Sequence, residues 1–199
     1  MAAERIATLE SSVAGVATNA MRIQSERLEL IAATAESARA AADDDRTQLG
    51  SMLECEIATD WPPEFLNEAA GPLAEALAGD PQDRYTMWYV VLREPRTLIG
   101  TVGIKAPPKD GRVDIGYSIV ASQQRRGYAT EATRRLVELA FEDPRVDRVV
   151  AETLPDLGPS IRVMEKCGFR QCAANVTGFS GEEGVVRFEL RRDGFGKAV

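Results

Sequence analysis

Alternating apolar and polar positions predict strands in both halves of the chain. Residues 25–31 alternate with a period of two, and the apolar runs 85–92 and 98–104 flank a short turn that contains Pro95. A period of two places successive side chains on opposite faces of a sheet, and two such runs around a turn are typical of a hairpin. The segments predicted as strands are residues 25–31, 85–92, 98–104, 115–120, 149–155, 171–176 and 185–190.

Helical spacing of apolar residues predicts helices between these strands. In the segment 129–142, Leu136 and Ala140 fall on one face, while Glu131 and Arg135 are spaced for an i,i+4 ion pair on the other face. The other predicted helices cover residues 35–44, 46–54, 63–77 and 159–167. This alternation of strands and helices indicates an α/β protein.

The chain of 199 residues is long enough for one well-buried domain and short for two. The predicted elements fall within residues 21–192, which we expect to form the domain, and residues 193–199 form a tail. In residues 1–20, Ile6 and Val13 belong to a set of apolar residues at helical spacing. This extension is either a short helix that docks on the chain or on a partner, or a variable segment ahead of the core, and we favour the second interpretation.

Composition and charge exclude several classes of protein. Apolar residues make up 44% of the chain and charged residues 28%, as in ordinary globular domains. No apolar run approaches the roughly 20 residues that span a bilayer, and the start of the chain lacks the apolar stretch of a signal peptide, so we expect a cytoplasmic protein. The net charge of −7 and the isoelectric point near 4.9 argue against nucleic acid as the main partner.

Metal and disulfide chemistry are not expected. The chain contains no histidine, and its three cysteines, Cys55, Cys167 and Cys172, do not have the spacing of a zinc site. An odd number of cysteines is also a poor basis for a disulfide framework. We therefore predict no metal site.

A predicted strand runs through a basic turn directly into a helix at residues 115–132. A helix N-terminus leaves backbone N–H groups unpaired and carries partial positive charge, so it can hold a pyrophosphate. Gly127 and Ala129 would let a phosphate oxygen approach the backbone, and Arg125 and Arg126 add cationic donors. The turn is neither a P-loop nor the glycine-rich turn of a dinucleotide fold, because it lacks both patterns.

The turn reads Q-x-x-G-x-A from Gln124 to Ala129, and this string resembles the acetyl-CoA signature of the GNAT superfamily of N-acetyltransferases. A second block, with Ser160 and Lys166 followed by Gly168 and Phe169, resembles another motif of that family. The family asparagine of this block is replaced by Leu157. The resemblance covers residues 21–192 and is closest to the ribosomal-protein N-terminal acetyltransferase branch.

This resemblance implies a single-domain fold whose mixed, mostly antiparallel sheet splays at the cofactor strand and is flanked by helices. It implies direct transfer of an acetyl group from acetyl-CoA, as co-substrate, to a primary amine. A backbone N–H near Ile119 or Val120 would then polarise the thioester carbonyl. The residues that the resemblance places at the cofactor are Ile119, Val120, Gln124, Arg125, Arg126, Gly127, Tyr128, Ala129 and Thr130.

The absence of histidine removes the commonest general base. Asp114, on the cofactor strand, and Glu152, on the next strand, remain equal candidates that would act through water, and each is also explained as a surface carboxylate. Ser160 matches the serine that donates a proton to the leaving thiolate in the family, although a hydroxyl there could instead cap the helix. Tyr117 is explained equally well as a pocket residue and as a core residue.

Several features of the function stay open. The acceptor could be a protein N-terminus or a small amine such as a polyamine or an aminoglycoside, because the branch contains both kinds of enzyme. The helices predicted in residues 35–77 either shape the acceptor pocket or only pack on the sheet. A non-catalytic acyl-CoA-binding module is a further alternative, as are a monomer and a homodimer.

Overall fold

The protein forms a single mixed sheet covered by helices on both faces. The computed structural model describes residues 20–64, 66–78 and 84–196, so the extension at residues 1–20, with both of its interpretations, lies almost wholly outside the described residues. The strands follow one another in the order β1-β2-β4-β5-β6-β7-β9-β8, and β3 pairs with β5 at its side. Six of the eight strand pairs are antiparallel, and the pairs β3–β5 and β6–β7 are parallel. The predicted mixed, mostly antiparallel α/β architecture is confirmed.

The strands lie close to the ranges that the alternation predicts. They are β1 (Arg22–Gln24), β2 (Leu28–Ala32), β3 (Glu56–Ile57), β4 (Met87–Leu92), β5 (Thr97–Ile104), β6 (Arg112–Ile119), β7 (Arg148–Thr153), β8 (Arg170–Val176) and β9 (Val185–Arg191). Strand β3 has two residues and is therefore too short to be predicted from a periodic sequence pattern.

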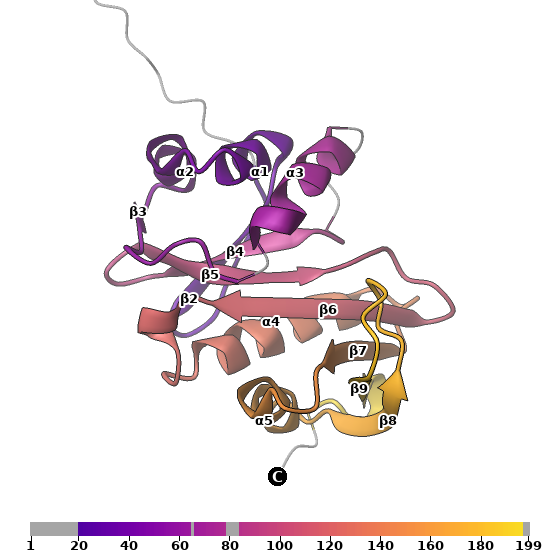
Figure 1. Ribbon diagram of the computed structural model, residues 1–199. Helices are drawn as coiled ribbons and strands as arrows, with labels where there is room; N and C mark the ends of the chain where they lie inside the picture. Colours follow the sequence, from indigo (N-terminus) through magenta and orange to yellow (C-terminus); the bar gives the residue numbers. More distant parts are fainter. Residues whose placement is uncertain (1–19, 65, 79–83, 197–199) are drawn as a thin grey trace, which may run out of the picture.

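In the part of the chain that the structure describes, five α-helices form two layers around the sheet (Figure 1). They are α1 (Ala35–Ala42), α2 (Arg46–Leu53), α3 (Leu66–Leu77), α4 (Tyr128–Glu142) and α5 (Gly158–Lys166). Helices α1, α2 and α3 cover one face, and α4 and α5 cover the other. In the described residues, no helix combines the length and the apolar character needed to cross a membrane.

The predicted strand at residues 25–31 is wrong at its start. Residues Ser25 to Arg27 form the turn of a hairpin between β1 and β2, and the Ser25 N–H donates to the Leu28 carbonyl at 2.9 Å. The polar Arg27 of the turn and the apolar Leu28 of β2 continue the alternation, so the sequence pattern does not show where the strand begins. The correction matters, since the turn projects Arg27 toward α4.

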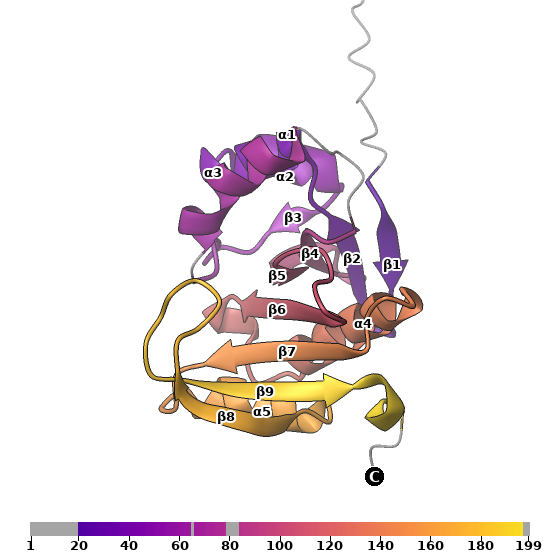
Figure 2. The same ribbon diagram turned by 90° about the vertical axis from the view of Figure 1, so that its right-hand side faces the viewer.

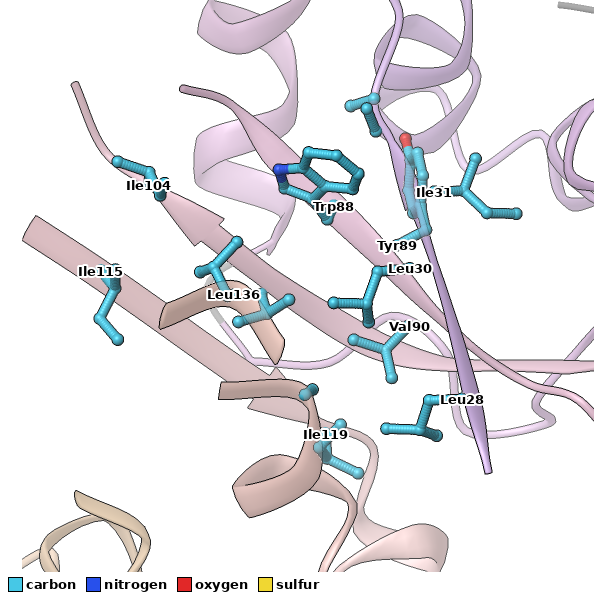
Figure 3. Packing of buried hydrophobic residues seen from close by; sticks show 14 of the residues in the cluster. Leu28, Leu30, Ile31, Trp88, Tyr89, Val90, Ile104, Ile115, Ile119 and Leu136 are labelled. Carbon is cyan, nitrogen blue, oxygen red and sulfur yellow. The ribbon is translucent and has the colours of Figure 1, made fainter. Parts of the chain in front are cut away.

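The core lies between the sheet and the two helical layers. Figure 3 shows Leu136 of α4 among apolar side chains from β2, β4 and β6. Leu136, Leu30 and Ile115 are each at most 2% exposed, so α4 is anchored by the apolar face that its helical spacing predicts. This anchor fixes where the N-terminus of α4 meets the end of β6.

Strands β5 and β6 approach each other unusually closely at Gly100. A Cβ at this position would lie 2.3 Å from the Ser118 carbonyl oxygen and 2.7 Å from Cδ1 of Ile119. A Cβ added at Gly116, on the partner strand, would meet its nearest heavy atom at 3.6 Å. The backbone at the end of β6 can therefore lie this close to β5 only because Gly100 has no side chain.

We expect Gly100→Ala to lower the free energy of unfolding by roughly 1–3 kcal/mol, because the added methyl group must displace backbone atoms. Gly116→Ala is the matched control and should change stability by less than about 0.5 kcal/mol or increase it, since alanine is favoured over glycine inside a strand. Urea unfolding of the three proteins measures the difference. Equal stability of the two variants would contradict the close approach.

Candidate active site

Strands β6 and β7 run side by side only at their beginnings. Their parallel pairing starts at Arg112 and Arg148 and ends at the pair Ile115 and Ala151, although both strands continue for at least two more residues. Beyond this point the two strands diverge and leave an opening in the sheet, which we call the splay. Figure 2 shows the two strands as neighbours between β5 and β9.

The backbone of β6 presents unpaired N–H groups to the splay. In an antiparallel pair, successive residues point their N–H groups alternately toward and away from the partner. The Val120 N–H donates to the Ile99 carbonyl of β5 at 2.9 Å, so the N–H groups of Ile119 and Tyr117 point to the other side, where β7 has diverged. Of the two predicted carbonyl donors, Val120 is thus occupied within the sheet, and Ile119 faces the opening.

The turn after β6 has the geometry of an anion site. Gly127 adopts a left-handed φ of 84° and immediately precedes α4, and no side chain caps this helix. The first intrahelical bond at this end runs from the Glu131 N–H to the Gly127 carbonyl at 3.0 Å. The N–H groups of Tyr128, Ala129 and Thr130, which precede it, therefore remain available to a bound anion.

The three polar side chains of the turn, Gln124, Arg125 and Arg126, differ in their roles. Gln124 folds back, and its Nε2 donates to the Ile119 carbonyl at 2.9 Å. Arg125 and Arg126 are exposed, and Arg125 adopts a positive φ of 62°. Gln124 thus holds the turn against the end of β6, and the two arginines are free to meet a ligand.

The first turn of α4 is fastened to the β1–β2 turn. Both Arg27 and Ser25 bind the Glu131 carboxylate: Arg27 Nη2 lies 2.7 Å from Oε2, and the Arg27 N–H and Ser25 Oγ donate to Oε1 at 2.8 and 2.7 Å. Arg27 Nη1 also donates to the Arg126 carbonyl at 3.1 Å. Burial alone would raise the pKa of Glu131, but these hydrogen bonds and the charge of Arg27 hold it below its ordinary value.

The predicted ion pair between Glu131 and Arg135 is wrong. Glu131 is bound by Arg27, and Arg135 lies 3.0 Å from Glu138 instead. An ion pair along one helix is worth only a few tenths of a kcal/mol, so a partner from another element displaces it readily. Arg27 carries no sequence signal of this role beyond its position before a strand.

A second support holds the other end of the turn. The Asp60 carboxylate accepts bonds from the N–H and from Oγ of Ser122, both at 2.8 Å. These bonds, led by the one from the N–H, lower the pKa of Asp60. The pair is separated by 62 residues along the chain, and the sequence analysis did not identify it.

Tyr117 and Ser160 meet across the splay. Tyr117 Oη lies 2.9 Å from the Ser160 carbonyl oxygen and 3.0 Å from Ser160 Oγ. Ser160 stands in the first turn of α5, and its hydroxyl lies toward Tyr117. No side chain caps this helix. Both residues are only partly buried.

Asp114 and Glu152, the two predicted bases, are already paired with arginines. Arg112 binds Asp114 through two nitrogens of one guanidinium edge, Nε and Nη2, with Nε 2.8 Å from Oδ2, and its Nη2 lies 3.6 Å from Glu152. Glu152 Oε1 accepts from Arg187 Nε at 2.6 Å, and its Oε2 accepts from the Phe179 N–H at 2.7 Å. The two carboxylates thus belong to one charged network on the face of the sheet that carries Arg187.

Glu152 also positions the β8–β9 loop. This loop rises past β7 toward β6 (Figures 1 and 2), and the bond to the Phe179 N–H ties it to β7. Burial would raise the pKa of Glu152, but the bonds from Arg187 and Phe179 and the charges of Arg187 and Lys105 lower it below its ordinary value. Among the described residues, no three His, Cys, Asp or Glu side chains gather as a metal site requires.

Leu157, which replaces the family asparagine, is 43% exposed and makes no side-chain bond at the start of α5.

An open cavity of about 860 Å³ lies on the outer side of α4. Its lining brings together Arg27, Arg134 and Lys166 with the backbone of Gly127. Basic side chains therefore continue from the turn along this flank, and the lining also contains Glu26, Glu131 and Glu138.

The sheet opens between two parallel strands, and beside this opening a helix begins at a turn that is suited to phosphate binding. These two features together define an acyltransferase of the GNAT class. The family profile described as "Acetyltransferase (GNAT) domain" matches residues 27–170. The chain therefore belongs to the GNAT acetyltransferase family.

Relatives of known sequence agree. The uncharacterized N-acetyltransferase YnaD of Bacillus subtilis is 30% identical over 107 residues, which are 54% of this chain and 61% of that protein. The uncharacterized N-acetyltransferase YjdG of the same organism is 26% identical over 154 residues, or 76% of this chain and 87% of the relative.

Solved structures show the same fold. A GNAT-family acetyltransferase from Bacillus anthracis matches with a TM-score of 0.61 at 20% identity, over 87% of this chain and 99% of that one. The ribosomal-protein-S5-alanine acetyltransferase from Vibrio fischeri matches with a TM-score of 0.60 at 17% identity, over 88% and 98% of the two chains.

We expect Glu152→Gln to lower the free energy of unfolding by about 1–3 kcal/mol near neutral pH, because the variant loses a charged acceptor of two hydrogen bonds. Since the folded-state pKa is lowered, this contribution is complete above the ordinary value of 4.5 and disappears as the pH falls through the lower folded-state value.

Urea unfolding of the two proteins over a series of pH values checks this expectation. Glu189→Gln is the control, because Glu189 is half-buried and its two arginine partners, Arg191 and Arg148, lie 3.6 and 3.9 Å away, beyond hydrogen-bond distance. A stability difference for Glu152→Gln that stays constant down to strongly acidic pH would show that the carboxylate charge does not matter.

Proposed function

We propose that this protein is an N-acetyltransferase that moves the acetyl group of acetyl-CoA directly to a primary amine. The observation that carries the proposal is the junction of the splay with the uncapped N-terminus of α4. The junction combines the N–H group of Ile119 at the splay with those of Tyr128, Ala129 and Thr130 at the turn. Acetyl-CoA joins a pyrophosphate to an acyl thioester, and so it needs both kinds of donor.

The residues of the turn fit the phosphate groups of this co-substrate. Unpaired helical N–H groups and the exposed Arg125 and Arg126 would bind the pyrophosphate. The basic residues Arg134 and Lys166 extend this surface along the cavity beside α4. We assign the cofactor-binding role to Ile119 and to residues 124–130 on this basis.

Acetyl-CoA supplies an activated thioester, so the protein's own contribution is to position the amine and to stabilise developing charge. The Ile119 N–H is the proposed donor to the carbonyl oxygen as it becomes an oxyanion. Ser160 is the proposed donor to the leaving sulfur, because its hydroxyl lies at the splay and caps no helix. The first group belongs to β6 and the second to α5.

Glu152 is the better placed of the two carboxylates to accept the proton of the amine through water. It follows the last residue of β7 that pairs with β6, where the sheet opens, whereas Asp114 precedes this point and is held by Arg112. A carboxylate whose pKa is lowered is a weak base, so it suits an amine that is already partly neutral. A protein α-amino group, with a pKa near 7.7–8.0, meets this condition better than a lysine near 10.4.

The acceptor class follows from the same condition. A peptide N-terminus is the first choice, and the fold neighbour described as a ribosomal-protein-S5-alanine acetyltransferase is consistent with it. A small amine is the second, since a kanamycin resistance protein of Rhizobium radiobacter is 41% identical over 51 residues. Release of free CoA thiol in the presence of N-terminal peptides, polyamines and aminoglycosides separates the two classes.

We expect calorimetry to show that the wild type binds acetyl-CoA and that Gly127→Glu weakens this binding at least tenfold. The new carboxylate would lie beside the helix N-terminus, where it repels the pyrophosphate and takes up the left-handed position that glycine tolerates.

Gly196→Glu is the matched control, because Gly196 also has a positive φ, of 79°, and no heavy atom within 4 Å of an added Cβ. Equal binding by the two variants would remove the turn from the cofactor site. Binding of acetyl-CoA without turnover on any amine of the panel would instead support a non-catalytic acyl-CoA-binding module.

A further inference from the structure

The hydroxyl groups of Tyr117 and Ser160 form a connected pair that the sequence motifs do not explain. Tyr117 Oη lies within 3.0 Å of two oxygens of Ser160, the carbonyl at 2.9 Å and Oγ at 3.0 Å. Tyr117 stands on β6 after the last residue paired with β7, and Ser160 stands on α5. The pair therefore bridges the splay where the sheet opens.

The number of hydrogens decides what this pair can do. Each hydroxyl carries one hydrogen and can also accept bonds. If Tyr117 donates to the Ser160 carbonyl, the Ser160 hydroxyl can donate back to Tyr117 Oη. If Tyr117 donates to Ser160 Oγ instead, the hydrogen of Ser160 is released for a third partner. Both acceptors lie at bonding distance, so rotation of the two hydroxyl hydrogens converts one arrangement into the other.

We propose that Tyr117 is a positioning residue that acts through Ser160: by donating to Ser160 Oγ, it directs the hydrogen of Ser160 to the leaving sulfur of the acyl donor. This inference rests on the proposed function and adds a residue that the family motifs leave out. Hydrogen bonds in a chain polarise one another, so the donor to the sulfur is strengthened by the tyrosine behind it.

The electrons and protons of the step balance without further reactants. The nitrogen lone pair forms the C–N bond as the carbonyl π pair moves to the oxygen. When the carbonyl re-forms, the C–S bond breaks and its electron pair stays on the sulfur, which the Ser160 hydroxyl stabilises. The amine loses one proton to water and the thiol gains one proton at the end, so the number of protons is unchanged. Tyr117 keeps its own proton throughout.

The surroundings keep both hydroxyls neutral. Burial raises the pKa of Tyr117 to about 12, with a smaller opposing effect from its bond to Ser160. The Cys167 thiol is the titratable group that acts on Tyr117, and burial raises its pKa to about 11, so it too is neutral under ordinary conditions. Tyr117 therefore remains a hydrogen-bond donor rather than a charge.

The test measures the pKa of the thiol of CoA bound to the protein and needs no acceptor. Thiolate absorbance is followed as the pH is raised, and the same protein saturated with desulfo-CoA is subtracted to remove the signal of its own cysteines. A donor to the sulfur lowers this pKa, because it stabilises the thiolate. We expect Ser160→Ala to raise it by about one unit, and Tyr117→Phe to raise it by at least about half a unit.

The double variant separates action through Ser160 from a merely structural effect. Tyr117→Phe should produce no further shift once Ser160 is alanine, whereas Ser160→Thr should retain both the low pKa and its sensitivity to Tyr117→Phe. Tyr89→Phe is the control, since Tyr89 lies on β4 in the core and should leave the bound thiol unchanged. An unchanged pKa in Tyr117→Phe, or a shift that adds in full to that of Ser160→Ala, would overturn the inference.

Calorimetric titration of CoA into each variant distinguishes this failure from failure of the proposed function. If the wild type does not bind CoA, both are overturned. If all variants bind CoA and only the thiol pKa fails to respond to Tyr117→Phe, the cofactor site stands and the role of Tyr117 is rejected.

Discussion

The loss of pairing between β6 and β7 after Ile115 and Ala151 is the constraint on which the rest of the site depends. A parallel pair that remained closed would use the N–H groups of Tyr117 and Ile119 inside the sheet. Because the strands separate, these groups face an opening, and a side chain from α5 can reach β6 there. The close approach of β5 at Gly100 keeps the end of β6 in the sheet while its other edge is left free.

The turn that follows β6 is held by bonds from distant parts of the chain. Arg27 secures the first turn of α4, and Asp60 secures Ser122 at the start of the turn. A helix N-terminus that offers its N–H groups to an anion gains no capping bond of its own, so it needs support from elsewhere. Arg27 also neutralises Glu131, whose charge would otherwise oppose an anion at the same end of the helix.

The carboxylates beside the splay illustrate how environment decides a chemical role. Asp114 and Glu152 are both bound by arginines, and Glu152 in addition holds the β8–β9 loop through the Phe179 N–H. Because its pKa is lowered, Glu152 stays ionised near neutral pH, orders its neighbours and accepts protons only weakly. Membership of the GNAT acetyltransferase family sets the type of reaction, and this network is one reason to expect an amine that is easily deprotonated.

The sequence by itself determined the helices, most of the strands, the turn at Gly127 and the family, because these depend on local periodicity, turn chemistry and a short motif. It left Asp114 and Glu152 as free carboxylates and paired Glu131 with Arg135. Only the tertiary structure decided that Glu131 binds Arg27, 104 residues away, that Glu152 binds Arg187, and that Tyr117 meets Ser160. Contacts between distant residues depend on which strands become neighbours and where they part, and a local pattern carries no information about either.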